Sequence, residues 1–105
     1  MYYQYRATIL RVVDGDTLDV SIDLGFNIFH KLRIRLKGVD CPELRTEEGK
    51  AAKAFVETWL EGLPVTIVTY KDEQEKYGRY LAKVLTAKGD LVNDLIAAGH
   101  VKKNA

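Results

Sequence analysis

The sequence predicts a mainly β protein with α (α+β), namely a five-stranded Greek-key barrel of the OB type with two helices. Two observations lead to this fold class. Apolar and polar residues alternate in 18-LDVSID-23 and 32-LRIRLKG-38, and a period of two residues is typical of strands with one buried face. A helical pattern follows the third predicted strand and precedes two more. Three meander strands, a helix and two further strands are the element order of an OB barrel.

The first strand covers residues 6–13, which are rich in β-branched and apolar side chains. The Asp-Gly pair in 14-DGDT-17 predicts a tight hairpin turn after it. The second strand, 18–23, ends at another turn, 24-LGFN-27. In the third strand, 32–38, alternation directs one set of side chains toward a core and the other set away from it. The outward set consists of Arg33, Arg35 and Lys37.

An apolar stripe marks the first helix, which follows an expected loop, 44-LRTEEG-49. Gly62 and Pro64 would end this helix, and we expect Trp59 to belong to the core. The residues of the stripe fall at helical spacing and are Ala52, Phe55, Val56, Trp59 and Leu60.

Two strand candidates, 65–70 and 80–86, and a final helix over 91–98 complete the pattern. Asp90 can cap this helix because its carboxylate can accept an orphan backbone N–H, and Gly99 suits the other end. The apolar stripe of the last helix would be Leu91, Leu95 and Ile96, and we expect Lys102 and Lys103 to form a frayed basic tail.

Length and composition fit one ordinary globular domain, residues 1–105. The net charge of +1 gives no global field to attract nucleic acid, so anion binding must come from local clusters. A single cysteine excludes an internal disulfide. No segment approaches the roughly 18 apolar residues of a membrane span, so we expect no membrane partner. The opening MYYQYRATIL is unlike a signal peptide, so we expect a cytoplasmic protein, with secretion after removal of a signal as the alternative.

Charged residues gather at strand ends and turns in three separate segments. In a small barrel the first and third strands can come close enough to place Asp16 beside Asp40. Carboxylates this close repel each other unless a metal ion, arginines or both lie between them. The three groups are Asp14 with Asp16, Arg35 with Asp40 and Glu43, and Arg79.

These residue types match the requirements of metal-assisted phosphodiester hydrolysis. Calcium and magnesium prefer oxygen ligands such as carboxylates. Arginines donate paired hydrogen bonds to phosphate oxygens and keep their charge at any useful pH. Glu43 would orient or deprotonate a water molecule. Each of these residues, taken singly, is more often structural than catalytic, and only their combination favours an enzyme.

The chain resembles the staphylococcal nuclease (thermonuclease) family in three blocks. These are 7-ATILRVVDGDTLDV-20, 33-RIRLKGVDCPE-43 and 76-KYGRYLAKV-84, and 91-LVNDLIAAGH-100 fits more loosely. The resemblance implies an OB-type barrel and a calcium-dependent endonuclease that binds one Ca²⁺ ion. Such an enzyme cleaves DNA and RNA phosphodiesters and leaves 3′-phosphates.

The resemblance also implies a role for each matching residue. Asp16 and Asp40 would be the calcium carboxylates, and Cys41 would supply a backbone carbonyl to the metal. We interpret the Cys41 thiol as a spectator, because thiolates suit hard cations poorly; a redox-sensitive thiol is the alternative. The catalytic residues would be Arg35, Arg79 and Glu43, and the residues contacting a terminal phosphate would be Lys76 and Tyr77.

The family's third, C-terminal helix and its tyrosines are missing from this sequence, so a second copy could cover the exposed barrel surface as a homodimer. Two other functions compete with the enzyme. A non-catalytic nucleic-acid-binding OB-like module would lack members of the carboxylate and arginine set, which is complete here. A scaffold component would show neither metal dependence nor cleavage. The sequence does not distinguish DNA from RNA as the substrate.

Overall fold

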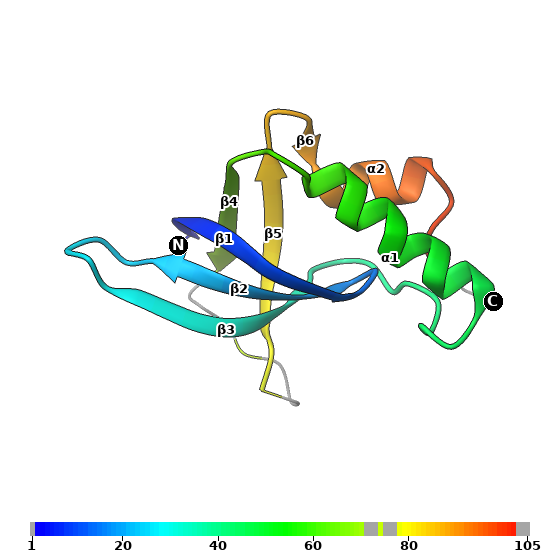
Figure 1. Cartoon of the computed structure of the whole chain (residues 1–105), viewed down its shortest axis with the longest axis horizontal. Coiled ribbons are helices and arrows are strands. Elements are labelled where there is room, and N and C mark those ends of the chain that lie inside the picture. Colours follow the sequence, from blue (N-terminus) through cyan, green and yellow to red (C-terminus); the bar gives the residue numbers. More distant parts are fainter. Residues whose placement is uncertain (1, 71–73, 75–77, 103–105) are drawn as a thin grey trace.

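The computed structural model describes residues 2–70, 74 and 78–102. It contains one six-stranded sheet in the order β3-β2-β1-β4-β5-β6, which β3 and β5 close into a barrel by parallel pairing. Two helices lie together at one end of this barrel (Figure 1). The elements are β1 (Tyr2–Asp14), β2 (Thr17–Asp23), β3 (Phe29–Leu36), α1 (Glu47–Leu60), β4 (Val65–Tyr70), β5 (Tyr80–Thr86), β6 (Gly89–Asp90) and α2 (Leu91–Ala97).

This architecture confirms the predicted fold class, a five-stranded mixed barrel with two helices, to which the structure adds the two-residue strand β6. The long strand β1 makes closure possible because it pairs with β4 through its first half and with β2 through its second half. Irregularities in the β1–β2 ladder lie between Ile9 and Arg11 and between Val12 and Asp14. Such bulges bend a strand and increase its twist.

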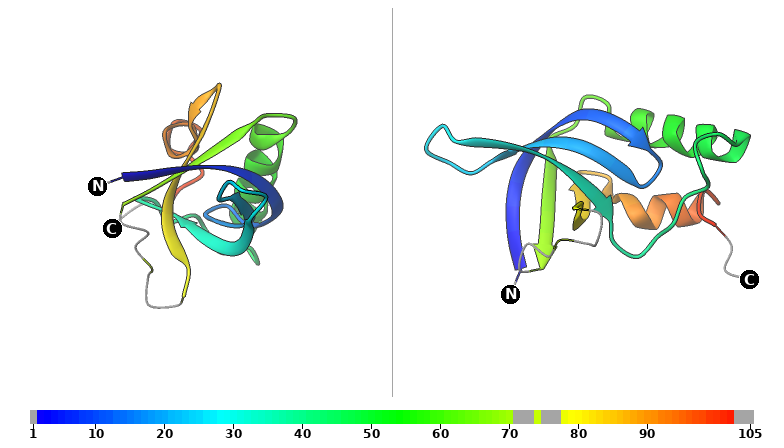
Figure 2. Two further views of the ribbon diagram at one scale, coloured as in Figure 1. Left: turned by 90° about the vertical axis from the view of Figure 1, so that its left-hand side faces the viewer. Right: turned by 90° about the horizontal axis from the view of Figure 1, so that it is seen from below.

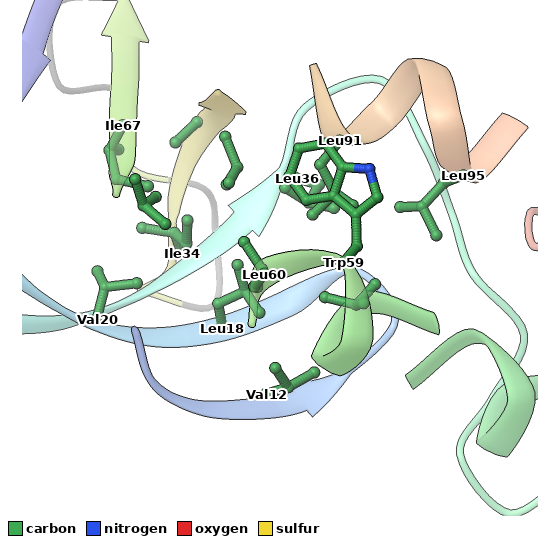
Figure 3. Close-up of a cluster of buried hydrophobic side chains, with 14 of the residues drawn as sticks. Val12, Leu18, Val20, Ile34, Leu36, Trp59, Leu60, Ile67, Leu91 and Leu95 are labelled. Carbon is green, nitrogen blue, oxygen red and sulfur yellow. The ribbon is translucent and has the colours of Figure 1, made fainter. Parts of the chain in front are cut away.

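The alternation in β2 and β3 gives the barrel its core, as the sequence predicted. The even-numbered residues of β2 are buried, and so are Ile34 and Leu36 of β3. Figure 3 shows how side chains from the strands, α1 and α2 meet in a single cluster. The largest fully buried members are Leu18, Val20, Ile34, Leu36, Val56, Ile67, Val84, Leu91 and Leu95.

Helix α1 begins earlier than expected, at Glu47, so only the first part of the expected 44–49 loop is a loop. Thr46 is the N-cap residue and accepts a hydrogen bond from Gly49 N. The expected core position of Trp59 is confirmed, since its side chain is buried. Its Nε1 donates to Asp94 Oδ2 of α2 at 2.6 Å, which joins the two helices.

Asp90 caps α2 as predicted, because its Oδ1 accepts a hydrogen bond from Val92 N at 3.0 Å. Two expectations near this helix were wrong. Ile96 is about half exposed and does not join the buried stripe of Leu91 and Leu95. Lys102 is not frayed, since its backbone N donates to the Asp40 carbonyl at 2.7 Å; Lys103 lies outside the described residues.

The β2–β3 hairpin projects beyond the barrel on the side away from the helices (Figures 1 and 2). Its far end is the expected turn 24–27, and its near end lies beside the turn between β1 and β2. Within the described residues, no helix has the length and apolar character to cross a membrane.

Candidate active site

The site is built around Asp16, which the tight turn between β1 and β2 places inside the protein. Its backbone N donates to Asp14 Oδ1 at 3.0 Å, and its carbonyl accepts from Leu36 N of β3 at 2.9 Å. The carboxylate accepts from Thr17 Oγ1 at 3.0 Å and from Cys41 N at 2.8 Å. Asp16 is therefore held, through its main chain and its side chain together, by neighbours from three separate parts of the chain.

Arg35 at the end of β3 connects the two candidate metal carboxylates. Its Nη2 lies 3.6 Å from Asp16 Oδ2 and forms an ion pair with Asp40 Oδ1. Its Nη1 donates to the carbonyls of Leu36 at 3.0 Å and Val39 at 2.6 Å. Only 16% of the Arg35 side chain is exposed, so it does not face open solvent as strand alternation suggested. The bonds to the two carbonyls give it a structural role that the sequence did not indicate.

Arg79 reaches the same cluster from the residue before β5. Its Nη1 lies 3.5 Å from Thr17 Oγ1, which in turn donates to Asp16. The parallel pairing of β3 with β5 explains this approach of Arg79. It places Leu81 of β5, two residues after Arg79, opposite Arg35 of β3. The barrel thus brings together four of the predicted carboxylate and arginine residues: Asp16, Arg35, Asp40 and Arg79.

Glu43 differs from these four residues. Its side chain is more than half exposed, and among the described residues its ion-pair partner is Arg45. This hydrogen bond from Arg45 lowers the pKa of the Glu43 carboxyl below its ordinary value. The main chain at Glu43 is well fixed, because its carbonyl accepts from Thr46 N at 3.0 Å and Thr46 Oγ1 at 2.7 Å.

The Cys41 thiol is buried between the first turn and α1. A Cβ added to Gly15 would lie 2.8 Å from Cys41 Sγ and 2.9 Å from Ala52 Cβ. Burial raises the pKa of this thiol to about 12, and the nearby carboxylates of Asp16 and Asp14 add to the effect. A thiol that stays protonated at neutral pH is a poor nucleophile, which agrees with its interpretation as a spectator.

The electrostatics of the site favour an additional cation. Burial raises the pKa of the Asp16 carboxyl, and the adjacent Asp14 carboxyl raises it further, whereas the bond from Cys41 N and the charge of Arg35 lower it. A carboxylate whose ionised form is disfavoured in this way gains from a nearby positive charge.

The donor atoms suit a hard cation, which takes carboxylate and carbonyl oxygens together with water. The described residues hold no group of three His, Cys, Asp or Glu side chains that could bind a metal by themselves. A metal ion here would therefore depend on the carboxylates of Asp16 and Asp40, the Cys41 carbonyl and water. The bond from Cys41 N to Asp16 holds the peptide between Asp40 and Cys41 beside the Asp16 carboxylate.

Lys76 and Tyr77, the predicted phosphate contacts, lie outside the described residues. Sequence reasoning missed Thr17, which links Asp16 to Arg79, and the Val39 carbonyl, which anchors Arg35. The threonine directly after Asp16 was a visible signal. The carbonyl gave none, because any residue carries one.

The chain is similar in sequence to known proteins. Residues 33–103 match the sequence profile of the family described as staphylococcal nuclease homologue. An uncharacterized endonuclease of Escherichia coli O157:H7 is 30% identical over 92 residues, covering 87% of this chain and 56% of that protein. Thermonuclease of Staphylococcus hyicus is 33% identical over 95 residues, covering 85% and 53%.

Endonuclease YhcR of Bacillus subtilis (strain 168) is 31% identical over 110 residues, which cover 92% of this chain and 9% of that protein. The chain thus spans about half the length of the first two relatives and a small part of the third. All three matches include most of this chain, so the similarity is not restricted to a short motif.

Proposed function

Because the chain belongs to the staphylococcal nuclease family, we propose that it is a calcium-dependent endonuclease that hydrolyses phosphodiester bonds of DNA or RNA and leaves 3′-phosphates. One observation supports this proposal above the others. Two carboxylates, those of Asp16 and Asp40, converge on the same nitrogen of Arg35, and a second arginine lies one hydroxyl group away.

The arginines carry the recognition of the phosphate in this mechanism. Arg35 and Arg79 would bind its oxygens, and their contacts strengthen as negative charge builds up on a five-coordinate phosphorus. The bonds from Arg35 to the Leu36 and Val39 carbonyls hold its guanidinium in place before substrate arrives. Such preorganisation lowers the reorganisation needed in the transition state.

A calcium ion would be held by the carboxylates of Asp16 and Asp40 and by the Cys41 carbonyl. When bound, it would neutralise charge on the phosphate and supply Lewis-acid assistance. Thr17 would maintain the geometry around it, because its hydroxyl bonds to Asp16 and faces Arg79.

Glu43 would orient or deprotonate the attacking water, and this role requires its carboxylate to leave Arg45. The ion pair between Glu43 and Arg45 is exposed on both sides, and exposed pairs contribute little stability. Its rearrangement on substrate binding therefore has a low energetic cost. The carboxylate is ionised at neutral pH, since its pKa is lowered, and an ionised carboxylate can accept a proton from water.

A digestion assay tests the proposal. Heat-denatured DNA and a matching RNA are incubated with the protein and calcium, magnesium or a chelator. We expect calcium-dependent cleavage with 3′-phosphate ends, and a loss of about 100-fold or more in the Glu43→Gln variant. Glu57→Gln, an exposed position on α1, is the matched control and should retain full activity.

Two results would contradict the proposal. Cleavage in the presence of chelator would remove the role of the metal ion. No cleavage under any condition, combined with retained binding of the oligonucleotide, would identify the chain as the non-catalytic nucleic-acid-binding module instead.

A further inference from the structure

The tip of the β2–β3 hairpin exposes large apolar side chains that the barrel does not cover. Leu24 is 46% exposed, Ile28 54%, Phe29 61% and Phe26 96%. Figure 2 shows this hairpin extending into solvent away from both helices. Contiguous exposed apolar residues on a soluble domain usually mark an interaction site.

Phe26 has a backbone conformation that adds weight to this interpretation. Its φ is +55°, and Asn27 beside it has φ +60°. Bulky residues rarely adopt this left-handed region because it costs free energy. No packing compensates the cost, because the side chain is almost fully exposed. The turn therefore exposes an aromatic ring to solvent in a backbone conformation that costs free energy, and no packing of that ring within the fold offsets the cost.

The outward face of β3 connects this tip to the candidate active site. Phe29, Lys31, Arg33 and Arg35 alternate with the inward residues of the strand and pair without irregularity with Asp23, Ser21, Asp19 and Thr17 of β2. All four therefore lie on one face of the sheet. At about 3.3 Å per residue, Phe29 lies roughly 20 Å along the strand from Arg35.

This face carries an excess of positive charge. Arg6 and Arg11 of β1 pair with Asp23 and Asp19 of β2, and Lys31 and Arg33 lie on β3. Arg33 is engaged by Asp19 through bonds of 2.7 and 3.1 Å. Lys31 is exposed and forms no ion pair with any described residue. With Arg35 included, five cations face three carboxylates, which are Asp14, Asp19 and Asp23, and this leaves a net charge of +2.

Two shallow hollows lie on this face. One, of about 330 Å³, is lined by Leu10, Asp19, Lys31 and Arg33 among others. The second, of about 580 Å³, includes Arg6, Ser21 and Phe29. The hollows combine cationic and hydroxyl groups with an aromatic or aliphatic wall, which suits nucleotides better than a purely apolar partner.

From this arrangement we propose that the outward face of β3 and the hairpin tip bind single-stranded nucleic acid that continues beyond the cleaved bond. Lys31 contacts a phosphate, and Phe26 and Phe29 stack on unpaired bases. The inference rests on the proposed function, because it takes the bound strand to run from a bond cleaved beside Arg35 toward the hairpin tip. Exposed aromatic rings interleaved with cations are the features that bind single strands with little regard to sequence. Paired bases present no free face to such rings, so the site selects single strands.

Binding without cleavage provides the main test. Anisotropy of a labelled 12-nucleotide oligothymidylate is measured in excess chelator with the wild type and with the Phe26→Ala, Phe29→Ala double variant. Stacking of one base on each of the two rings predicts roughly 30-fold or more weaker binding in the variant. Ile96→Ala, at an exposed apolar residue on α2, is the matched control and should bind as the wild type does.

Charge variants sharpen the test. Lys31→Ala should reduce the slope of log K against log salt by about 0.7, the amount expected for one phosphate contact on a single strand. Lys83→Ala, at an exposed position on β5, should leave the slope unchanged. Asp19→Asn should tighten binding several-fold because it releases Arg33 from its ion pair.

A spectroscopic signature distinguishes stacking from a general loss of affinity. In Phe26→Trp, an indole at the tip should be quenched by oligothymidylate, whereas the emission of the buried Trp59 should not change in the wild type. Melting curves of the Phe26, Phe29, Lys31, Lys83 and Ile96 variants should superimpose on that of the wild type, since the replaced side chains are exposed.

Three results would overturn the inference. The first is unchanged oligonucleotide binding in the double variant, and the second is an equal loss of binding in Ile96→Ala. The third is a shift from dimer to monomer in the double variant with binding retained, which would make the tip a self-association surface. Failure of the proposed function is recognised separately. A wild type that never cleaves but shows the predicted binding pattern would refute the nuclease and leave this surface established.

Discussion

The two ends of the β2–β3 ladder obey the same alternation of residues and have opposite environments. At one end, Arg35 is enclosed by the 36–40 segment and bonded to two carbonyls and two carboxylates. At the other end, Phe29 and Phe26 are open to solvent. The charged residue is the more buried one and the aromatic residues are the exposed ones. Outward-facing positions on a strand therefore acquire their roles from the segments that cover them.

Removal of Arg35 should have the largest effect at the enclosed end. Arg35→Ala would leave Asp16 buried without its positive partner and should lower the free energy of unfolding by about 3 kcal/mol. Cleavage should fall about 100- to 1000-fold. Arg79→Ala should lose similar activity with a smaller loss of stability, because Asp16 keeps its ion pair with Arg35 in that variant. Urea denaturation and initial rates measure both quantities, and equal stability losses would contradict the distinction.

Glycines at the two ends should respond differently to the same substitution. Gly15→Ala would place a methyl group 2.8 Å from Cys41 and 2.9 Å from Ala52, so crowding should cost about 1–3 kcal/mol and displace the site. Gly25 has open space around it and φ +78°, so Gly25→Ala should cost only about 1 kcal/mol of conformational strain. Thermal unfolding with parallel activity assays would separate them. A loss of stability in Gly25→Ala as large as that in Gly15→Ala would contradict the comparison.

Asp16→Asn should stabilise the metal-free protein while it abolishes cleavage. The raised pKa of Asp16 means that its ionised form disfavours folding at pH values above its unfolded pKa. The advantage of the variant should therefore be present at pH 7 and should vanish below about pH 4. Melting temperatures measured across this range in chelator test the sign. A variant less stable than the wild type at pH 7 would show that the bonds from Thr17 and Cys41 depend on the charge.

The smallest expected effect concerns Cys41. Because its pKa is raised to about 12, the folded protein retains a proton that the unfolded chain loses near pH 9. The free energy of unfolding should consequently fall as pH rises from about 9 to 12. The Cys41→Ser variant should not show this fall. At pH 8 a thiol reagent should label the native protein slowly and the urea-unfolded chain rapidly. Fast labelling of the native state would restore the alternative of a reactive thiol.

Much of the fold followed from local patterns. The period of two in β2 and β3, the Asp-Gly turn and the helical stripe through Trp59 all correspond to elements of the structure. Ile96 was misplaced because a seven-residue helix that packs on one side leaves its flanking apolar residue exposed. Lys102 was misplaced because its hydrogen bond to Asp40 joins residues 62 positions apart, and periodicity does not report such contacts.

For this protein the sequence by itself determined the elements, their order and the residue types available for phosphate chemistry. Only the tertiary structure decided that Arg35 lies between Asp16 and Asp40, that Thr17 links them to Arg79, and that Glu43 is paired with Arg45. The reason is physical. The two-residue period of a strand predicts which side of the strand a residue faces. Barrel closure and the segments packed over that side decide the neighbours of the residue, its burial and its charge state.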